Sequence, residues 1–323
     1  MTKARVTIDS LARVGSGLVR PECVLTNWRG DVFTADWRGG VAHRKPDGTA
    51  ELYLAESGSG PRLRPNGIAL CRDGSFLVAD LGEHDGGLYR LTRTGQVTRL
   101  LDEVDGVCLP PSNFPLLDVQ GRIWLTVSTR RQPRAEAYRR DVADGFVVLL
   151  DQGCARIVAD GLGYTNEAQI SPDGQWLYVN ETFGRRLSRF RIGGNGDLGP
   201  RETVTVFGEG VFPDGLCFDA EGGIWITSIV SNRVIRIAPS GEQQLIIEDC
   251  DEAHLAWVEA AYLNNSMSRE HLDRSGGAYL GNISSLAFGG SDLKTAYLGC
   301  LLDDCVYRFR SPVAGLASVH WLY

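Results

Sequence analysis

Side chains that carry oxygen recur at one position of successive repeats in this 323-residue chain. The repeats open with Glu, Asn or Asp, and a weaker sixth copy opens with Ser. These ring residues are Glu22, Asn66, Asn113, Asn166, Asp214 and Ser284. No Lys or Arg occupies an equivalent position, so two carboxylates facing three amides would need a cation if they were buried together. A ligand set without His or Cys favours calcium, magnesium or manganese over a dedicated zinc site.

The elements that would bring these residues together are short strands at a regular spacing. The starts are separated by 44, 47, 53, 48 and 70 residues, and a turn glycine follows eight residues after each of the first five. Repeats of 40–50 residues built from strands are typical of a β-propeller. We therefore predict an all-β fold, a six-bladed β-propeller of four-stranded antiparallel blades. The N-terminal stretch 4–14 should close the ring beside the strand VYRFR, which removes an exposed edge.

The direction of the strands predicts which residues share the mouth of the channel with the ring. The second strand of each repeat returns toward the ring, so Trp37 and Glu181 should border this mouth. Two long segments, 129–144 and 250–282, fall on the same face and are predicted to cover it. The second has apolar residues at helical spacing, which predicts a short helix around 252–272.

Composition limits the possible functions and partners. The repeats cover nearly all of residues 1–323, which predicts one domain, and a net charge of −7 argues against nucleic-acid binding. There is no long apolar run and no signal-like N-terminus, so we expect no membrane contact and a cytoplasmic location. The eight cysteines lack metal-site spacing and are expected to be free thiols, buried where they fall on inner strands. We expect a monomer or a small homo-oligomer.

Two segments carry a resemblance to a known family. YTNEAQISPDGQWLYVNET and FPDGLCFDAEGGIWITS, together with Glu22 and Asn113, resemble the senescence marker protein/gluconolactonase family, which is regucalcin-like and distantly related to diisopropyl fluorophosphatase. The resemblance implies a six-bladed propeller with a divalent metal at the channel mouth. It also implies that the metal ligands are Glu22, Asn113, Asn166 and Asp214. Asn66 would then face the substrate or a metal-bound water. Calcium is the first expectation, with zinc, magnesium or manganese as alternatives.

The chain also departs from that family in the third repeat. Phe114 follows Asn113 where many members have Asp, and Pro111 stands where an Arg is common. A sugar lactone is therefore in question as substrate. A replacement cation could come from Arg130, Arg131 or Arg134. A more apolar pocket is indicated by Trp37, Phe114, Phe183 and Trp257. We take Asn66, Trp37, Arg130, Glu181, His254 and Trp257 as candidate substrate-binding residues.

The expected chemistry is hydrolysis of a lactone or a related ester at the metal. A metal polarises the carbonyl and lowers the pKa of bound water, Asp214 is the candidate base, and Glu22 is the alternative base. One alternative uses the same metal to stabilise an enolate, as a dehydratase, retro-aldol lyase or isomerase does, with Glu167 or Glu181 moving protons. Another alternative is a binding propeller without turnover. The substrate in each case is a small molecule that the sequence does not identify.

Overall fold

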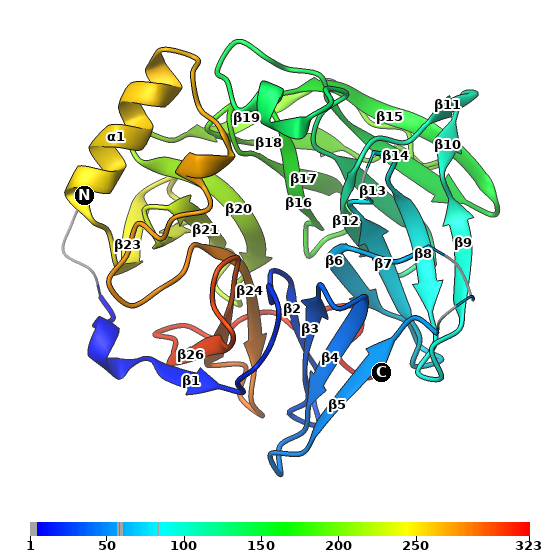
Figure 1. Cartoon of the computed structure of the whole chain (residues 1–323), viewed down its shortest axis with the longest axis horizontal. Helices are drawn as coiled ribbons and strands as arrows, with labels where there is room; N and C mark the ends of the chain where they lie inside the picture. The colour runs from blue at the N-terminus through cyan, green and yellow to red at the C-terminus, as the bar shows by residue number, and fades with distance from the viewer. Residues whose placement is uncertain (1–4, 57, 59–60, 83) are drawn as a thin grey trace.

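The chain forms a six-bladed β-propeller, as predicted, with the blades arranged around one axis (Figure 1). The structure is a computed structural model and describes residues 5–56, 58, 61–82 and 84–323. The first three blades are continuous in sequence. Blade 1 consists of β2 (Val24–Thr26), β3 (Val32–Asp36), β4 (Gly40–Arg44) and β5 (Ala50–Leu54). Blade 2 consists of β6 (Pro65–Leu70), β7 (Phe76–Asp80), β8 (Gly87–Leu91) and β9 (Val97–Leu101). Blade 3 consists of β12 (Ser112–Leu117), β13 (Ile123–Val127), β14 (Gly145–Asp151) and β15 (Cys154–Leu162).

The remaining blades follow the same order, and the last one is completed from the N-terminus. Blade 4 consists of β16 (Thr165–Ile170), β17 (Trp176–Glu181), β18 (Arg186–Arg191) and β19 (Glu202–Val206). Blade 5 consists of β20 (Val211–Phe218), β21 (Ile224–Val230), β22 (Arg233–Ile237) and β23 (Gln243–Glu248). Blade 6 consists of β24 (Ile283–Gly289), β25 (Thr295–Cys300), β26 (Val306–Arg310) and β1 (Ala12–Val14). All neighbouring strands within the blades pair antiparallel.

The propeller closes where β1 pairs with β26, in the register Arg13 opposite Tyr307. The predicted closing strand is confirmed but is shorter than the stretch 4–14, of which residue 4 lies outside the described part of the chain. Residues outside the blades include the hairpin of β10 (Glu103–Val104) and β11 (Val107–Cys108), which the sequence did not predict. The helical elements are η1 (Ile8–Ser10), η2 (Arg134–Ala137), α1 (Glu252–Leu263) and η3 (Arg269–His271). Helix α1 confirms the predicted helical insertion.

Apolar side chains between adjacent blades form the core. One cluster joins blades 1 and 2 through Phe33 and Phe76, and another joins blades 3 and 4 through Trp124 and Leu177. All eight cysteines are free; four of them are buried, whereas Cys108 and Cys154 are exposed. No helix among the described residues is long and apolar enough to cross a membrane.

A buried aspartate stabilises the turn between the first two strands of blades 3 and 5. In blade 5, Asp219 accepts hydrogen bonds from the Trp225 indole at 2.7 Å, Arg236 Nε at 2.6 Å and the Gly223 backbone at 2.7 Å. Asp118 accepts from Trp124 and Arg122 in the same way in blade 3. Burial by itself would raise the pKa of Asp219, but the bonds from Arg236, Trp225 and Gly223 outweigh it and lower this pKa.

Replacing Asp219 with Asn should lower the free energy of unfolding at pH 7 by about 2–3 kcal/mol, because three donors lose a charged acceptor. A carboxylate with a lowered pKa contributes stability above its unfolded pKa of about 3.9, and that contribution is lost as the pH falls through the folded pKa. The difference between the two proteins should therefore stay constant from pH 5 to 8 and shrink below about pH 4. Urea denaturation at several pH values measures it. Asp173→Asn, in the exposed turn of blade 4, is the control and should change little. A difference that grows at low pH would contradict the assignment.

Candidate functional site

Five of the six ring residues occupy β-bulges at one end of the inner strands, and Glu22 lies just before the inner strand β2. In blade 3, Ser112 pairs with Val127 and Phe114 pairs with Thr126, so Asn113 has no partner of its own. The inner strands of blades 2, 4, 5 and 6 are interrupted at the equivalent place, between Pro65 and Ile68, Thr165 and Ala168, Pro213 and Leu216, and Ile283 and Ser285. Each interruption contains a ring residue. A bulge bends the strand and redirects a side chain, which is how these blades can present oxygens at the channel mouth.

Glycines let the bulged segments pack closely against the next blade. A Cβ added at Gly67, which follows Asn66, would lie 2.7 Å from the Phe114 Cα. A Cβ at Gly215, which follows Asp214, would lie 2.8 Å from the Ser284 backbone oxygen. Both approaches are shorter than any normal carbon contact. The two glycines therefore allow neighbouring inner strands to approach, and with them the ring residues.

Hydrogen bonds between neighbouring blades connect the ring. Asn66 Nδ2 donates to the backbone oxygen of Asn113 at 3.2 Å, and Ser284 Oγ donates to the backbone oxygen of Glu22 at 2.8 Å. Asn180 Nδ2 donates to the backbone oxygens of Asp214 and Gly215, both at 3.0 Å. The ring residues are all buried. The structure thus places the predicted ring at one end of the channel, in a protected environment.

The two amide candidates are oriented by hydroxyl groups that directly follow the second strand of their own blade. Asn113 Nδ2 donates to Ser128 Oγ at 3.0 Å, and Asn166 Nδ2 donates to Thr182 Oγ1 at 3.0 Å. Thr182 in turn donates to the Pro213 backbone oxygen at 2.8 Å. With its nitrogen engaged, Asn113 leaves Oδ1 buried, with no hydrogen-bond partner among the described residues. A buried, unpartnered amide oxygen is a group that a bound cation would satisfy.

The two carboxylates of the ring differ in what surrounds them. Glu22 Oε2 accepts from Arg20 Nε at 3.0 Å, and the Arg20 guanidinium stacks over Trp37 with 4.4 Å to the ring centroid. No described residue donates a hydrogen bond to the Asp214 carboxylate. Burial raises the pKa of Asp214 well above its ordinary range, and Glu22 and Glu167 raise it further, whereas Arg20 and Arg134 partly oppose this. A bound divalent cation would offset the repulsion between these carboxylates.

The donor set agrees with a hard cation. Among the described residues, no three His, Cys, Asp or Glu side chains are grouped to hold a metal. Amide oxygens also bind such ions, and half of the predicted set consists of Asn113 and Asn166. The residues that could hold a cation are therefore two carboxylates and two amides, which is an all-oxygen set suited to calcium.

Of the three arginines proposed as a replacement cation, Arg134 is the one that extends to the ring. Its Nη2 donates to Ser128 Oγ at 3.1 Å, so it shares the hydroxyl that orients Asn113. Arg130 instead forms a two-point ion pair with Asp160 at 2.8 Å, and Arg131 lies 3.7 Å from Asp144. The sequence did not distinguish these three neighbours, because their order along a loop says little about direction.

Three further candidates near the mouth differ in their contacts; they are Asn66, Trp37 and Glu181. Asn66 is part of the ring, as described, and Trp37 stacks against Arg20, with its indole nitrogen buried and unpartnered among the described residues. Glu181 is fully buried, and its carboxylate accepts from Arg186 and Ser188 and from the Gly163 backbone. Both oxygens are therefore engaged within blade 4. This arrangement disfavours a direct contact between Glu181 and the substrate.

The two long segments cover blades 4 and 5 together. Tyr138 stacks on Phe183 with centroids 4.8 Å apart, and Tyr262 of α1 donates to the Phe183 backbone oxygen at 2.8 Å. Glu259 of α1 forms a buried ion pair with Arg185. The insertion is thus packed onto the blades. In Figure 1, α1 lies toward the outer edge of the molecule, away from the centre where the inner strands meet.

This position affects the two candidate substrate contacts on the helix. Trp257 stacks on His271 with centroids 4.1 Å apart and is 36% exposed. His254 packs beside Trp257, and burial lowers its pKa. Both residues are engaged with the rest of the insertion. That His254 and Trp257 contact the substrate stays a prediction, and the location of α1 does not support it.

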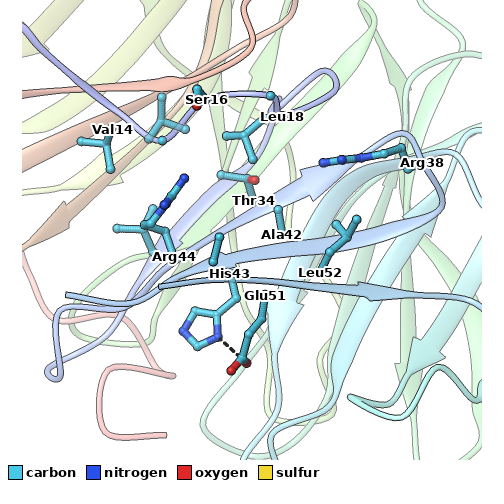
Figure 2. Close-up of a pocket in the computed structure, with 15 residues that line it drawn as sticks. Val14, Ser16, Leu18, Thr34, Arg38, Ala42, His43, Arg44, Glu51 and Leu52 are labelled. Carbon is cyan, nitrogen blue, oxygen red and sulfur yellow. Dashed lines mark ion pairs between the residues drawn. The ribbon is translucent and has the colours of Figure 1, made fainter. Parts of the chain in front are cut away.

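Two cavities lie away from the mouth. One, of about 590 Å³, occupies the turn end of the channel. Its walls include Cys23 just before β2, Glu167 and Cys217 on inner strands, and His320 on the C-terminal segment. Burial raises the pKa of Glu167 to about 8. A pocket of about 190 Å³ lies between the N-terminal segment and blade 1, where His43 and Glu51 form an ion pair (Figure 2). No ring residue lines either cavity.

Comparison with known proteins agrees with the geometry. Residues 112–249, which span blades 3 to 5, match the family described as SMP-30/Gluconolactonase/LRE-like region. The protein therefore contains a gluconolactonase-like region. The resemblance predicted from the sequence is confirmed. A 6-deoxy-6-sulfogluconolactonase from Pseudomonas putida is 28% identical over 268 residues, covering 78% of each chain.

Solved structures support the propeller fold of this chain along its length. Regucalcin from Agrobacterium tumefaciens, described as a calcium-binding protein, superimposes with a TM-score of 0.69 at 18% identity over 98% of both chains. A gluconolactonase from Xanthomonas campestris gives a TM-score of 0.68 at 20% identity, covering 94% of this chain and 89% of the other. At these identities the likeness concerns the propeller fold.

Removing the hydroxyl of Ser128 should weaken cation binding without unfolding the protein. In Ser128→Ala the Asn113 amide loses the partner that leaves Oδ1 toward the ring, and such supporting contacts are worth roughly 10- to 100-fold in metal affinity. Calorimetric titration with Ca²⁺ or Mn²⁺ alone measures the change. Ser171→Ala removes a comparably buried hydroxyl from the turn end of the channel and should leave the affinity as it is. Equal losses in both variants would contradict a specific role for Ser128.

Proposed function

We propose that this protein is a metal-dependent hydrolase that opens a lactone or a related ester at the channel mouth. The observation that carries the proposal is the bulged ring, in which the unpartnered Oδ1 of Asn113 is buried together with Glu22 and Asp214. The gluconolactonase-like region supports the reaction class. So do two similar proteins, one described as a 6-deoxy-6-sulfogluconolactonase and the other as a gluconolactonase.

The proposed cation ligands are Glu22, Asn113, Asn166 and Asp214, with calcium as the first candidate. The calcium-binding description of regucalcin supports that choice, and the all-oxygen donor set is consistent with it. When bound, such an ion would polarise the lactone carbonyl and lower the pKa of a coordinated water. The chain's own contribution is to fix the donors through Ser128 and Thr182 and to keep the ring buried.

Asp214 is the proposed base. Arg20 engages an oxygen of Glu22, whereas no described residue donates to the carboxylate of Asp214, so Asp214 has the freer oxygens. It would take a proton from the attacking water as the water oxygen bonds to the carbonyl carbon. The ring C–O bond then breaks, and the proton is returned to the departing alkoxide to give the hydroxy acid. Asn66, which donates to the adjacent backbone, is proposed to border the substrate.

We propose that the loop that contains η2 partly encloses the site for the small-molecule substrate. Tyr138, Tyr164 and Phe183 form a buried aromatic group between this loop and blade 4. Excluding water from such a site strengthens the electrostatic interactions within it. An enolate reaction would need Glu167 or Glu181 as a proton carrier. Glu181 is engaged by Arg186 and Ser188, whereas Glu167 accepts from the Leu216 backbone N–H at 3.0 Å and lines the cavity at the turn end of the channel. Hydrolysis is therefore the reaction that we propose.

Asp214→Asn should retain cation binding within about tenfold while kcat falls roughly 10²- to 10⁴-fold, because an amide keeps an oxygen donor but cannot accept the proton. The rate of lactone opening is measured by proton release, and cation binding is measured by calorimetry on the same preparation. Together they separate the effect on kcat from the effect on binding. Removing the ion with a chelator should abolish turnover and leave the circular dichroism spectrum of the blades unchanged. A near-normal rate in metal-bound Asp214→Asn would transfer the base role to Glu22.

Turnover in ¹⁸O-labelled water distinguishes hydrolysis from enolate chemistry. Hydrolysis should place one solvent oxygen in the carboxylate of the product, since the attacking water supplies it. Isomerisation would instead exchange carbon-bound hydrogen in D₂O. Mass spectrometry of products from parallel reactions in the two solvents reads out both. Deuterium on carbon without ¹⁸O in the carboxylate would overturn the lactonase proposal.

A further inference from the structure

Arg134 lies beside the ring without an acidic partner. It begins the short helix η2, and its guanidinium donates to Ser128 Oγ at 3.1 Å. Its Nε is buried and has no hydrogen-bond partner among the described residues. No described Asp or Glu lies within ion-pair distance of it. A partly buried guanidinium with an unused donor is costly unless an anion is available to it.

Six other arginines on this face are neutralised. Ion pairs join them to acids close by, so their charge is not available to a ligand. The pairs are Arg20 with Glu22, Arg130 with Asp160, Arg185 with Glu259, Arg186 with Glu181, Arg139 with Asp141, and Arg269 with Asp273. Arg134 differs from them because it contacts the Ser128 hydroxyl and the face of Tyr164. Its guanidinium carbon lies 5.5 Å from the centroid of the Tyr164 ring.

The position of Arg134 relative to the ring is set by one shared atom. Ser128 Oγ accepts from both Arg134 Nη2 and Asn113 Nδ2, so the guanidinium lies one hydroxyl away from a proposed cation ligand. Arg20 and Arg134 together balance the charges of Glu22 and Asp214. With a cation bound the mouth would therefore carry net positive charge, which favours an anionic substrate.

We propose that Arg134 binds an anionic group on the lactone, so that the substrate class is a lactone bearing a carboxylate, sulfonate or phosphate. This inference rests on the proposed lactonase function and adds a specificity-determining residue to it. The planar guanidinium presents parallel N–H donors that match these anions at two points. The aromatic face of Tyr164 limits the directions that the guanidinium can take.

The test compares neutral and anionic lactones on the metal-loaded full chain. The substrates are glucono-1,5-lactone, its 6-phospho and 6-deoxy-6-sulfo derivatives, and glucaro-1,4-lactone, which carries a carboxylate. Arg134→Ala should raise KM for the anionic lactones roughly 10- to 100-fold and change it less than about threefold for the neutral one. Arg134→Lys should recover part of the loss as a point charge. The order of preference among the three anions shows which group the site fits.

Arg131→Ala is the matched control, because it removes a positive charge from the same loop at a residue that faces Asp144. It should leave the ratio of anionic to neutral KM unchanged. Ca²⁺ titration of Arg134→Ala should show an affinity within about threefold of the parent protein. If KM rises equally for neutral and anionic lactones, or Ca²⁺ affinity falls with it, Arg134 only positions Ser128 and the inference is wrong.

Product binding separates failure of this inference from failure of the proposed function. Calorimetry with 6-phosphogluconate and gluconate needs no turnover. A preference for the phosphorylated acid that disappears in Arg134→Ala supports the anion site even if no lactone is opened, in which case the lactonase proposal alone falls. Lactone opening without any anion preference in the parent protein would refute the anion site and leave the lactonase proposal in place.

Discussion

Closing six twisted sheets around one axis forces the inner strands together, and at the mouth five of these strands carry a bulge in the same place. The bulge interrupts the ladder of one blade and leaves a residue that pairs with none opposite. Asn66, Asn113, Asn166, Asp214 and Ser284 occupy these interruptions. The candidate site is therefore a consequence of how the fold closes, and the glycines after Asn66 and Asp214 provide the space that this closure needs.

The ring concentrates oxygen atoms and negative charge in a buried place, and the surrounding residues compensate for that cost. Ser128 and Thr182 engage the amide nitrogens of Asn113 and Asn166, so the amide oxygens are left for another partner. Arg20 lies against Glu22, while Asp214 has no donor among the described residues. Such a combination of oriented oxygens and unequal carboxylates fits a cation with one carboxylate free for chemistry.

The covering segments show what loops add to a rigid propeller. The loop after β13 delivers Arg134 to the ring and Tyr138 to the aromatic group on blade 4. The insertion containing α1 packs on the same group through Tyr262 and pairs Glu259 with Arg185. The blades thus fix the ring, whereas the loops decide which charge and which apolar surface surround it.

The sequence by itself determined the propeller, the strand that closes it, the helical insertion and the ring positions, because a repeat with a turn glycine at a constant offset is a local signal. It did not determine which of Arg130, Arg131 and Arg134 points to the ring. Nor did it show that Glu181 is engaged by Arg186, or that α1 lies toward the edge. Those outcomes depend on contacts between segments far apart in the chain, such as Arg130 with Asp160. Tertiary packing decides them because adjacent arginines in a loop are chemically equivalent until partners separate them.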